Sequence, residues 1–138
     1  MSEVHRHVVS ISMAIAILLM LTTVTFTILI YADIMACQRT CELIESRVIE
    51  VVAYARYERN VVIVMSLKDV VSRPFELYVL NSTHLEVRVS LKYFSNVMVK
   101  RIVALPSGLY FNYTGLIPPN FSLVFKEVDG KVFVNVRP

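Results

Sequence analysis

The stretch Val8–Ala32, VVSISMAIAILLMLTTVTFTILIYA, contains only apolar residues, Ser, Thr and Tyr, and carries no charge. About 20 consecutive apolar residues suffice for a helix to cross the hydrocarbon core of a bilayer. A secretory signal has a shorter apolar region, of about 7–15 residues, before its cleavage site. The stretch therefore favours a retained helix that spans a membrane or forms the core of a filament.

Beyond this stretch, apolar residues recur at alternating steps of three and four, with charged residues between them. This spacing is typical of an amphipathic helix with a narrow apolar stripe. No Gly or Pro occurs before Pro74, so nothing in the sequence requires the helix to break. We therefore expect one continuous helix over residues 8–58, of which residues 33–58 are amphipathic. Its helix packing seam is predicted to consist of Ile34, Cys37, Cys41, Ile44, Val48, Val51 and Ala55.

The two cysteines of the chain both lie on this seam. Side chains four residues apart share a helix face, but their Cβ atoms are too far apart for an unstrained disulfide. We interpret Cys37 and Cys41 as small apolar packing residues, and a bridge to a neighbouring subunit is the alternative. The segment Ile34–Cys37 also resembles a bacterial-type lipobox, which would make Cys37 a lipidated N-terminus. Asp33 and the length of the apolar stretch argue against that interpretation.

The residues before the apolar stretch, MSEVHRH, form a short head with Arg6 as its basic residue. Positive charge is retained on the cytoplasmic side of a membrane helix, and the opposite flank begins with the acidic Asp33. We expect residues 1–7 in the cytoplasm and the remainder of the chain after the span outside. His5 and His7 could form a metal-binding pair, but no third ligand is near in sequence, and no metal site is predicted.

After Asn60 the apolar period changes from 3.6 to 2, which is typical of half-buried strands. Apolar residues alternate with polar ones on both sides of the turn Asn81–Thr83, which predicts an antiparallel hairpin. Asp129-Gly130 predicts a tight turn between two further strands. Six or seven short strands are expected over residues 60–138. The predicted fold class is α+β: a long helix followed by a small antiparallel β-sandwich, pilin-like or immunoglobulin-like.

Three tripeptides in this part of the chain match the acceptor pattern for N-glycosylation. They begin at Asn81, Asn112 and Asn120. Each lies at or beside a predicted turn, where Asn and Ser are common for conformational reasons alone. The three together favour an extracytoplasmic β-domain, with turn chemistry as the alternative interpretation at each site.

The sequence contains no nucleophile elbow, P-loop, dinucleotide fingerprint or H-E-x-x-H motif. We predict no catalytic residue, no bound cofactor and no enzymatic activity. Residues 60–138 carry nine Lys/Arg and five Asp/Glu, a balance of +4, but the basic residues form no run and no cluster with aromatic residues. Nucleic acid is therefore not expected as a partner.

The architecture resembles that of type IV pilins, and in particular the archaeal pilin-like and archaellum-like surface proteins. The resemblance rests on Val8–Ala32, on the stripe Ile34–Ala55, and on the C-terminal hairpin around Phe125–Val132. It implies a structural subunit of a cell-surface filament that assembles through its helix with itself or with other pilin-like subunits. It also implies a β-domain that faces outward for adhesion or for contact with cell-envelope proteins.

The residues before the apolar stretch keep several forms of this hypothesis open. Archaeal prepilins usually carry a basic residue and then Gly or Ala at the peptidase site, whereas here Arg6 and His7 precede Val8. Many pilins have Glu at the fifth mature position, which would be Ser12 in this chain if cleavage preceded Val8. A major pilin, a minor pilin and an uncleaved anchored relative therefore remain alternatives. A single-pass membrane-anchored β-sandwich that binds a cell-envelope partner without polymerising is the competing interpretation.

Overall fold

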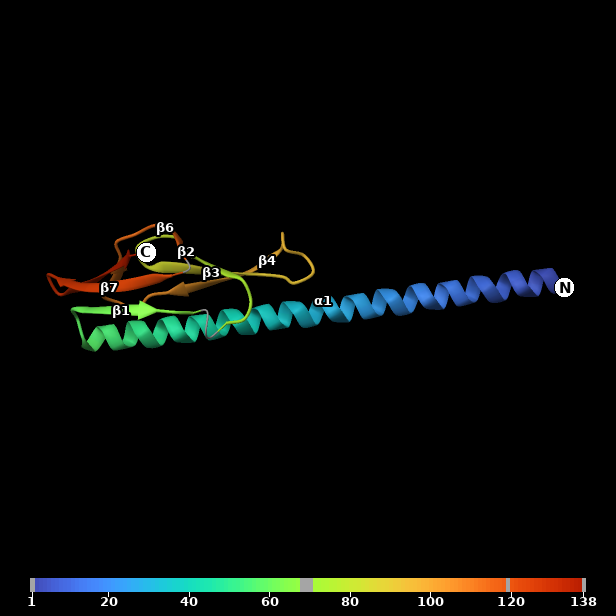
Figure 1. Cartoon of the computed structure of the whole chain (residues 1–138), viewed down its shortest axis with the longest axis horizontal. Helices are drawn as coiled ribbons and strands as arrows, with labels where there is room; N and C mark the ends of the chain where they lie inside the picture. The colour runs from blue at the N-terminus through green and yellow to red at the C-terminus, as the bar shows by residue number, and fades with distance from the viewer. Residues whose placement is uncertain (1, 68–70, 119, 138) are drawn as a thin grey trace.

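The computed structural model describes residues 2–67, 71–118 and 120–137. Within these ranges one helix, α1 (Glu3–Tyr57), is followed by eight strands, which gives the expected α+β fold. The C-terminal half of α1 lies along the β-domain, and its N-terminal half projects beyond it (Figure 1). At 1.5 Å per residue the helix is about 80 Å long, more than twice the thickness of a bilayer core.

The helix begins at Glu3 rather than at Val8, and it ends at Tyr57. Ser2 is the N-cap, because its Oγ accepts a hydrogen bond from the backbone N–H of His5 at 3.4 Å. Glu3 adds a negative charge in the first turn, where the helix dipole favours it. The residues predicted as a separate head are therefore helical from Glu3 onward.

The strands form two open four-stranded sheets, in the orders β1-β7-β8-β5 and β4-β3-β2-β6. Neighbouring strands are antiparallel except for β5 and β8. The bounds are β1 (Val61–Met65), β2 (Phe75–Val79), β3 (His84–Ser90), β4 (Met98–Ala104), β5 (Leu109–Phe111), β6 (Gly115–Ile117), β7 (Phe121–Val128) and β8 (Lys131–Arg137).

The two predicted turns are confirmed. Between β2 and β3, the Asn81 side chain organises the turn, because its Oδ1 accepts hydrogen bonds from the backbone N–H groups of Thr83 and His84, both at 2.9 Å. Between β7 and β8, Asp129 and Gly130 have φ angles of 52° and 78°. Two successive positive φ values match the type I′ turn that suits a tight hairpin.

Two features of the sheets differ from the sequence prediction. The three-residue strand β6 was not anticipated, and the described residues contain eight strands rather than six or seven. The pairing of β5 with β8 is parallel, with Leu109 opposite Val132. Between these strands the chain crosses to the other sheet as β6 and returns as β7. A three-residue strand is too short for an alternating pattern to predict its partner.

The core forms where α1 meets both sheets. Val48 and Val52 of the helix line the same small apolar space as Leu77 of β2 and Leu123 of β7. Ile44 of α1 is completely buried, and burial of such a side chain contributes about 2 kcal/mol. The amphipathic half of α1 is therefore part of the β-domain rather than a stalk beneath it.

We predict that a charge on the buried side of α1 destabilises the β-domain and that the same charge one residue later does not. Val48 is 5% exposed and Ile49 is 43% exposed. Val48→Asp should lower the free energy of unfolding by about 3 kcal/mol, because it buries an unpaired carboxylate, whereas Ile49→Asp should change it by less than about 0.5 kcal/mol.

The measurement is thermal unfolding of the purified chain in detergent, monitored through the near-ultraviolet circular dichroism of its tyrosines. Wild-type protein in the same detergent is the reference. Equal losses for Val48→Asp and Ile49→Asp would contradict the packing described for α1.

Candidate functional site

The N-terminal half of α1 presents a continuous apolar surface that the β-domain leaves uncovered. By length and composition this segment could cross a membrane, and the most apolar 18-residue window has no buried residue in the single chain. Apolar surface of this extent is unusual on a protein that meets only water. Its large exposed side chains include Val8, Ile11, Ile15, Leu18, Leu21, Phe26 and Ile28.

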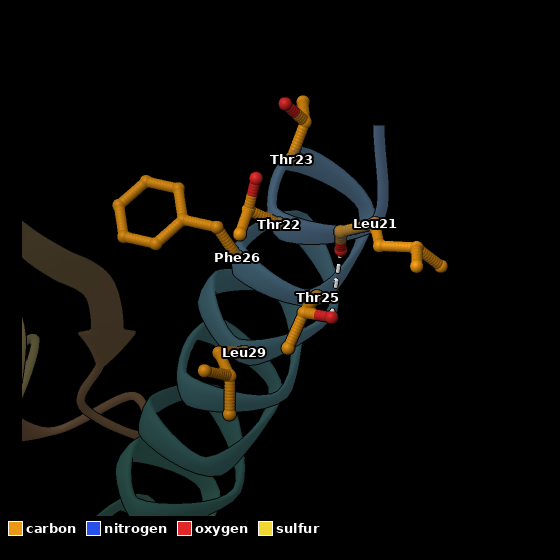
Figure 2. Close-up of a pocket in the computed structure, with 6 residues that line it drawn as sticks. All are labelled: Leu21, Thr22, Thr23, Thr25, Phe26 and Leu29. Atoms are coloured by element: carbon orange, nitrogen blue, oxygen red, sulfur yellow. Dashed lines mark hydrogen bonds between the residues drawn. The ribbon is translucent and has the colours of Figure 1, made fainter. Parts of the chain in front are cut away.

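The threonine hydroxyl groups on this surface are hydrogen-bonded to the backbone of the helix itself. The Oγ1 atoms of Thr22, Thr23 and Thr25 each donate to the carbonyl oxygen four residues earlier, at 2.8 Å. Figure 2 shows the bond from Thr25 to Leu21 and the shallow hollow that these side chains line. A threonine satisfied in this way can lie in an apolar environment without an unpaired donor.

Phe26 marks the place where the β-domain reaches the apolar half of the helix. Its side chain extends from α1 toward the strands (Figure 2). Its ring meets the ring of Phe94 edge to face, with the centroids 6.1 Å apart. Phe94 belongs to the segment of residues 91–97 between β3 and β4, which we call the β3–β4 loop. The loop projects past the sheets along α1, in the direction of the N-terminus (Figure 1).

A buried carboxylate lies immediately after the apolar stretch. Asp33 is 5% exposed, and its Oδ2 accepts a hydrogen bond from the backbone N–H of Lys92 at 2.7 Å. Its Oδ1 is paired with the guanidinium of Arg73, which also contacts the sulfur of Cys37 at 3.3 Å. This carboxylate therefore ties α1 to the β3–β4 loop and to the segment before β2.

The charged partner decides the ionisation of this carboxyl group. The hydrogen bond from Arg73 lowers the pKa of Asp33 below its ordinary value of 3.8, and the N–H of Lys92 acts in the same direction. Burial opposes this shift but does not reverse it. The pKa of Arg73 is raised, chiefly by the same hydrogen bond. Asp33 and Arg73 are therefore both charged at neutral pH.

The residues predicted as a packing seam face the β-domain. Most of them are at most 5% exposed: Cys37, Cys41, Ile44, Val48 and Ala55. Ile34 and Val51 are partly buried against the same core. Val52, which the predicted set omitted, is 2% exposed and is buried more deeply than Val51. A helix turns by 100° per residue, so Val51 and Val52 lie at opposite edges of the stripe, and the regular spacing alone does not show which edge is buried more deeply.

Both cysteines are free and buried in the contact between helix and sheet. The Sγ of Cys37 donates to the carbonyl oxygen of Ser90 at 3.5 Å. The Sγ of Cys41 lies 3.9 Å from the carbonyl oxygen of Val99. Burial raises the pKa of both thiols, which keeps them protonated. A disulfide to a neighbouring subunit would require either sulfur to leave this contact.

Ion pairs flank the seam on its solvent side. Arg101 of β4 pairs with Glu45 and lies 3.7 Å from Glu42, both on α1. At the far end of the helix, Arg59 pairs with Glu127 of β7 at 2.6 Å. These pairs are partly exposed, so each adds little stability. The Arg101 pairs join α1 to the edge strand β4, and the Arg59 pair joins the residues just after α1 to β7.

The three acceptor asparagines are all exposed on the β-domain. Asn81 uses its Oδ1 within the β2–β3 turn, and the Nδ2 of Asn112 donates to Asn135 at 3.1 Å. Asn120 directly precedes β7. Their positions leave both the glycosylation hypothesis and the turn interpretation open.

His5 and His7 are exposed on the first turns of α1, and His84 lies at the start of β3 beside the Asn81 side chain. Within residues 2–67, 71–118 and 120–137, no three His, Cys, Asp or Glu side chains are grouped so that they could hold a metal ion.

We predict that the contribution of Asp33 to stability is lost in acid. Its pKa in the folded protein is below the value of about 3.9 for an unfolded chain, so the contribution is complete above that value. It disappears as the pH falls through the folded pKa and the carboxylate becomes protonated. Asp33→Asn should therefore lower the melting temperature at neutral pH, and its difference from wild type should shrink in strong acid.

The measurement is the melting temperature against pH for wild type, Asp33→Asn and the control Asp129→Asn. Asp129 is exposed in a turn that Asn also tolerates, so this control should follow wild type at every pH. A difference between wild type and Asp33→Asn that stays constant from neutral pH to strong acid would contradict the prediction.

Comparison of the chain with models of known protein families, with curated proteins and with solved structures finds no match.

Proposed function

We propose that the chain is a pilin-like structural subunit of a cell-surface filament, which assembles through the apolar half of α1 and carries its β-domain outward. The observation that carries the proposal is the apolar surface of residues 8–32, exposed in the single chain yet continuous with a helix that is built into the β-domain. Such a surface requires lipid or other apolar helices around it.

Contact between helices is supported by the shape of α1 near its N-terminus. Ser10 and Ala14 are small residues four apart, and this spacing lets two apolar helices approach closely. They belong to a shallow hollow on the helix surface lined by Arg6, Val9, Ser10, Met13, Ala14 and Ile17. Larger side chains of a second helix could pack into such a hollow, as in other helix pairs.

The proposed topology places residues 1–7 in the cytoplasm and the β-domain outside. Arg6 lies before the apolar stretch, and the flank after the stretch carries Asp33, Glu42 and Glu45 against Arg39, so the basic excess is on the N-terminal side. In this topology Asn81, Asn112 and Asn120 are available for glycosylation, and the exposed sheet faces are available for adhesion.

The second candidate function is a single-pass anchored protein that binds a cell-envelope partner without polymerising. It is favoured by β1, which lies at the edge of its sheet. Val62 and Val64 of this strand are 62% and 79% exposed. An edge strand with exposed apolar side chains can accept an extended segment of a partner as an additional strand.

We predict that the chain is a component of filaments sheared from the cell surface. The check is negative-stain microscopy of sheared material combined with mass spectrometry for this chain. A charge in the hollow, Ala14→Arg, should remove the chain from filaments, because the charge would be buried between helices, whereas Tyr57→Arg on the exposed end of α1 should not. Recovery of the wild-type chain only as a monomer in the membrane fraction would favour the second candidate.

We also predict that a thiol introduced at Ser82 is accessible from outside the cell. Ser82 is exposed in the β2–β3 turn, and Cys37 and Cys41 are replaced by Ala so that only the introduced thiol reacts. Ser82→Cys should react with a membrane-impermeant maleimide on intact cells. His5→Cys, on the other side of the proposed membrane span, should react only after lysis. The reverse pattern would place the β-domain in the cytoplasm and exclude a surface filament.

A further inference from the structure

We propose that the β3–β4 loop is a second membrane contact of the chain, immersed in the interfacial region of the same bilayer that holds α1. The inference rests on the membrane-resident state of the proposed function. It assigns to residues 91–97 a lipid partner, phospholipid headgroups and the adjoining acyl chains, in addition to the span formed by the helix.

The height of the loop follows from its contact with the helix. Phe94 meets Phe26, which lies six residues before the end of the apolar stretch at Ala32, or about 9 Å along the helix axis. The 25 residues of the stretch measure about 37 Å, against about 30 Å for the hydrocarbon core. Whichever part of the stretch the core covers, Phe26 lies within about 10 Å of its outer boundary, and the ring of Phe94 is 6.1 Å from that of Phe26.

The side chains of the loop suit that depth. Tyr93, Phe94 and Val97 are 52%, 42% and 51% exposed, although they are apolar or aromatic. Aromatic side chains are enriched at the level of the lipid headgroups, where one end meets apolar chains and the other meets water. The two aromatic side chains and Val97, all within seven residues, form a local apolar tip that continues the exposed surface of the helix.

The charges beside the loop suit a layer of phosphates. A cleft of about 630 Å³ opens next to it and is lined by Ser72, Arg73, Pro74, Ser90, Leu91, Lys92 and Ser95. It contains three hydroxyl groups and the Lys92 ammonium, which are ordinary ligands of a phosphate group, whereas the Arg73 guanidinium on its wall is already paired with Asp33. The Lys92 ammonium lies 5.7 Å from the centre of the Tyr93 ring, so the charge and the aromatic ring are held together.

The loop is fixed in this position before any lipid is present. Its backbone closes on itself, because the N–H of Leu91 donates to Val97 at 3.0 Å and the N–H of Val97 donates to Phe94 at 2.9 Å. The Asp33 carboxylate holds the N–H of Lys92 at 2.7 Å. The apolar tip is therefore pre-organised, and insertion does not require the backbone to become ordered.

The test uses introduced tryptophans as reporters, since the chain contains none. The full chain is reconstituted in phosphatidylcholine–phosphatidylglycerol vesicles, with and without lipid brominated near the top of its acyl chains. Phe94→Trp should show blue-shifted emission and lose intensity in brominated vesicles. Tyr93→Trp is a second reporter on the same loop and should also lose intensity in brominated vesicles. It keeps the test valid if Phe94→Trp folds poorly.

Two matched variants serve as the positive and the negative control for quenching. Phe26→Trp reports on the span itself and should also be quenched. The side chain of Tyr57 is 89% exposed in wild type and lies about 46 Å from Phe26 along the helix axis. The emission of Tyr57→Trp should therefore keep its intensity in brominated vesicles.

The outcomes separate the inference from the function on which it rests. Quenching at position 26 without quenching at positions 93 and 94 would overturn the loop contact and leave the membrane span intact. Blue-shifted but unquenched emission at position 94 would overturn it in favour of a protein neighbour, such as the helix of a second copy. No quenching at position 26 would show that α1 is not in lipid, and would refute the membrane-resident state itself.

Discussion

The apolar stripe of α1 between Cys37 and Ala55 is the surface on which the β-domain completes its core, and the rest of the molecule depends on that contact. Two open four-stranded sheets leave an apolar interior that the strands do not enclose. Val48 and Val52 of the helix fill the space between β2, β3 and the strands of the other sheet. Without the helix this interior would meet water, so the β-domain and the second half of α1 form one folding unit.

This dependence gives the apolar half of α1 a fixed relation to the β-domain. No Gly or Pro interrupts the helix between Glu3 and Tyr57, and no linker separates its two halves. A rotation or tilt of the apolar half of the helix therefore turns the β-domain with it. The faces of α1 that the domain covers, such as the side of Phe26 that meets Phe94, are closed to other helices, while the remaining faces are open.

Much of this arrangement was predictable from local patterns in the sequence. The three-four spacing predicted a continuous amphipathic helix, and the alternation around Asn81 and Asp129 predicted two hairpins that the structure contains. The role of Asp33 was not predictable, because its partners Arg73 and Lys92 lie 40 and 59 residues away in sequence. The sequence indicates only that Asp33 begins an acidic flank after the apolar stretch. The β5–β8 pairing was not predictable either, because β5 has only three residues and the chain crosses to the other sheet before β8.

The buried pair of Asp33 and Arg73 fixes the position of α1 along the β-domain, which the apolar stripe alone does not. Apolar contacts have little direction, and a stripe that repeats every seven residues could pack against the sheets after a shift of about 10 Å along the helix. A shift of that size would separate the Asp33 carboxylate from Arg73 and from the N–H of Lys92, and would leave charges buried without partners. Such a loss is far more costly than the exchange of one aliphatic contact for another. The pair therefore selects one register of the helix on the β-domain. The same register sets the height of the β3–β4 loop relative to the apolar stretch, and so brings Phe94 level with Phe26.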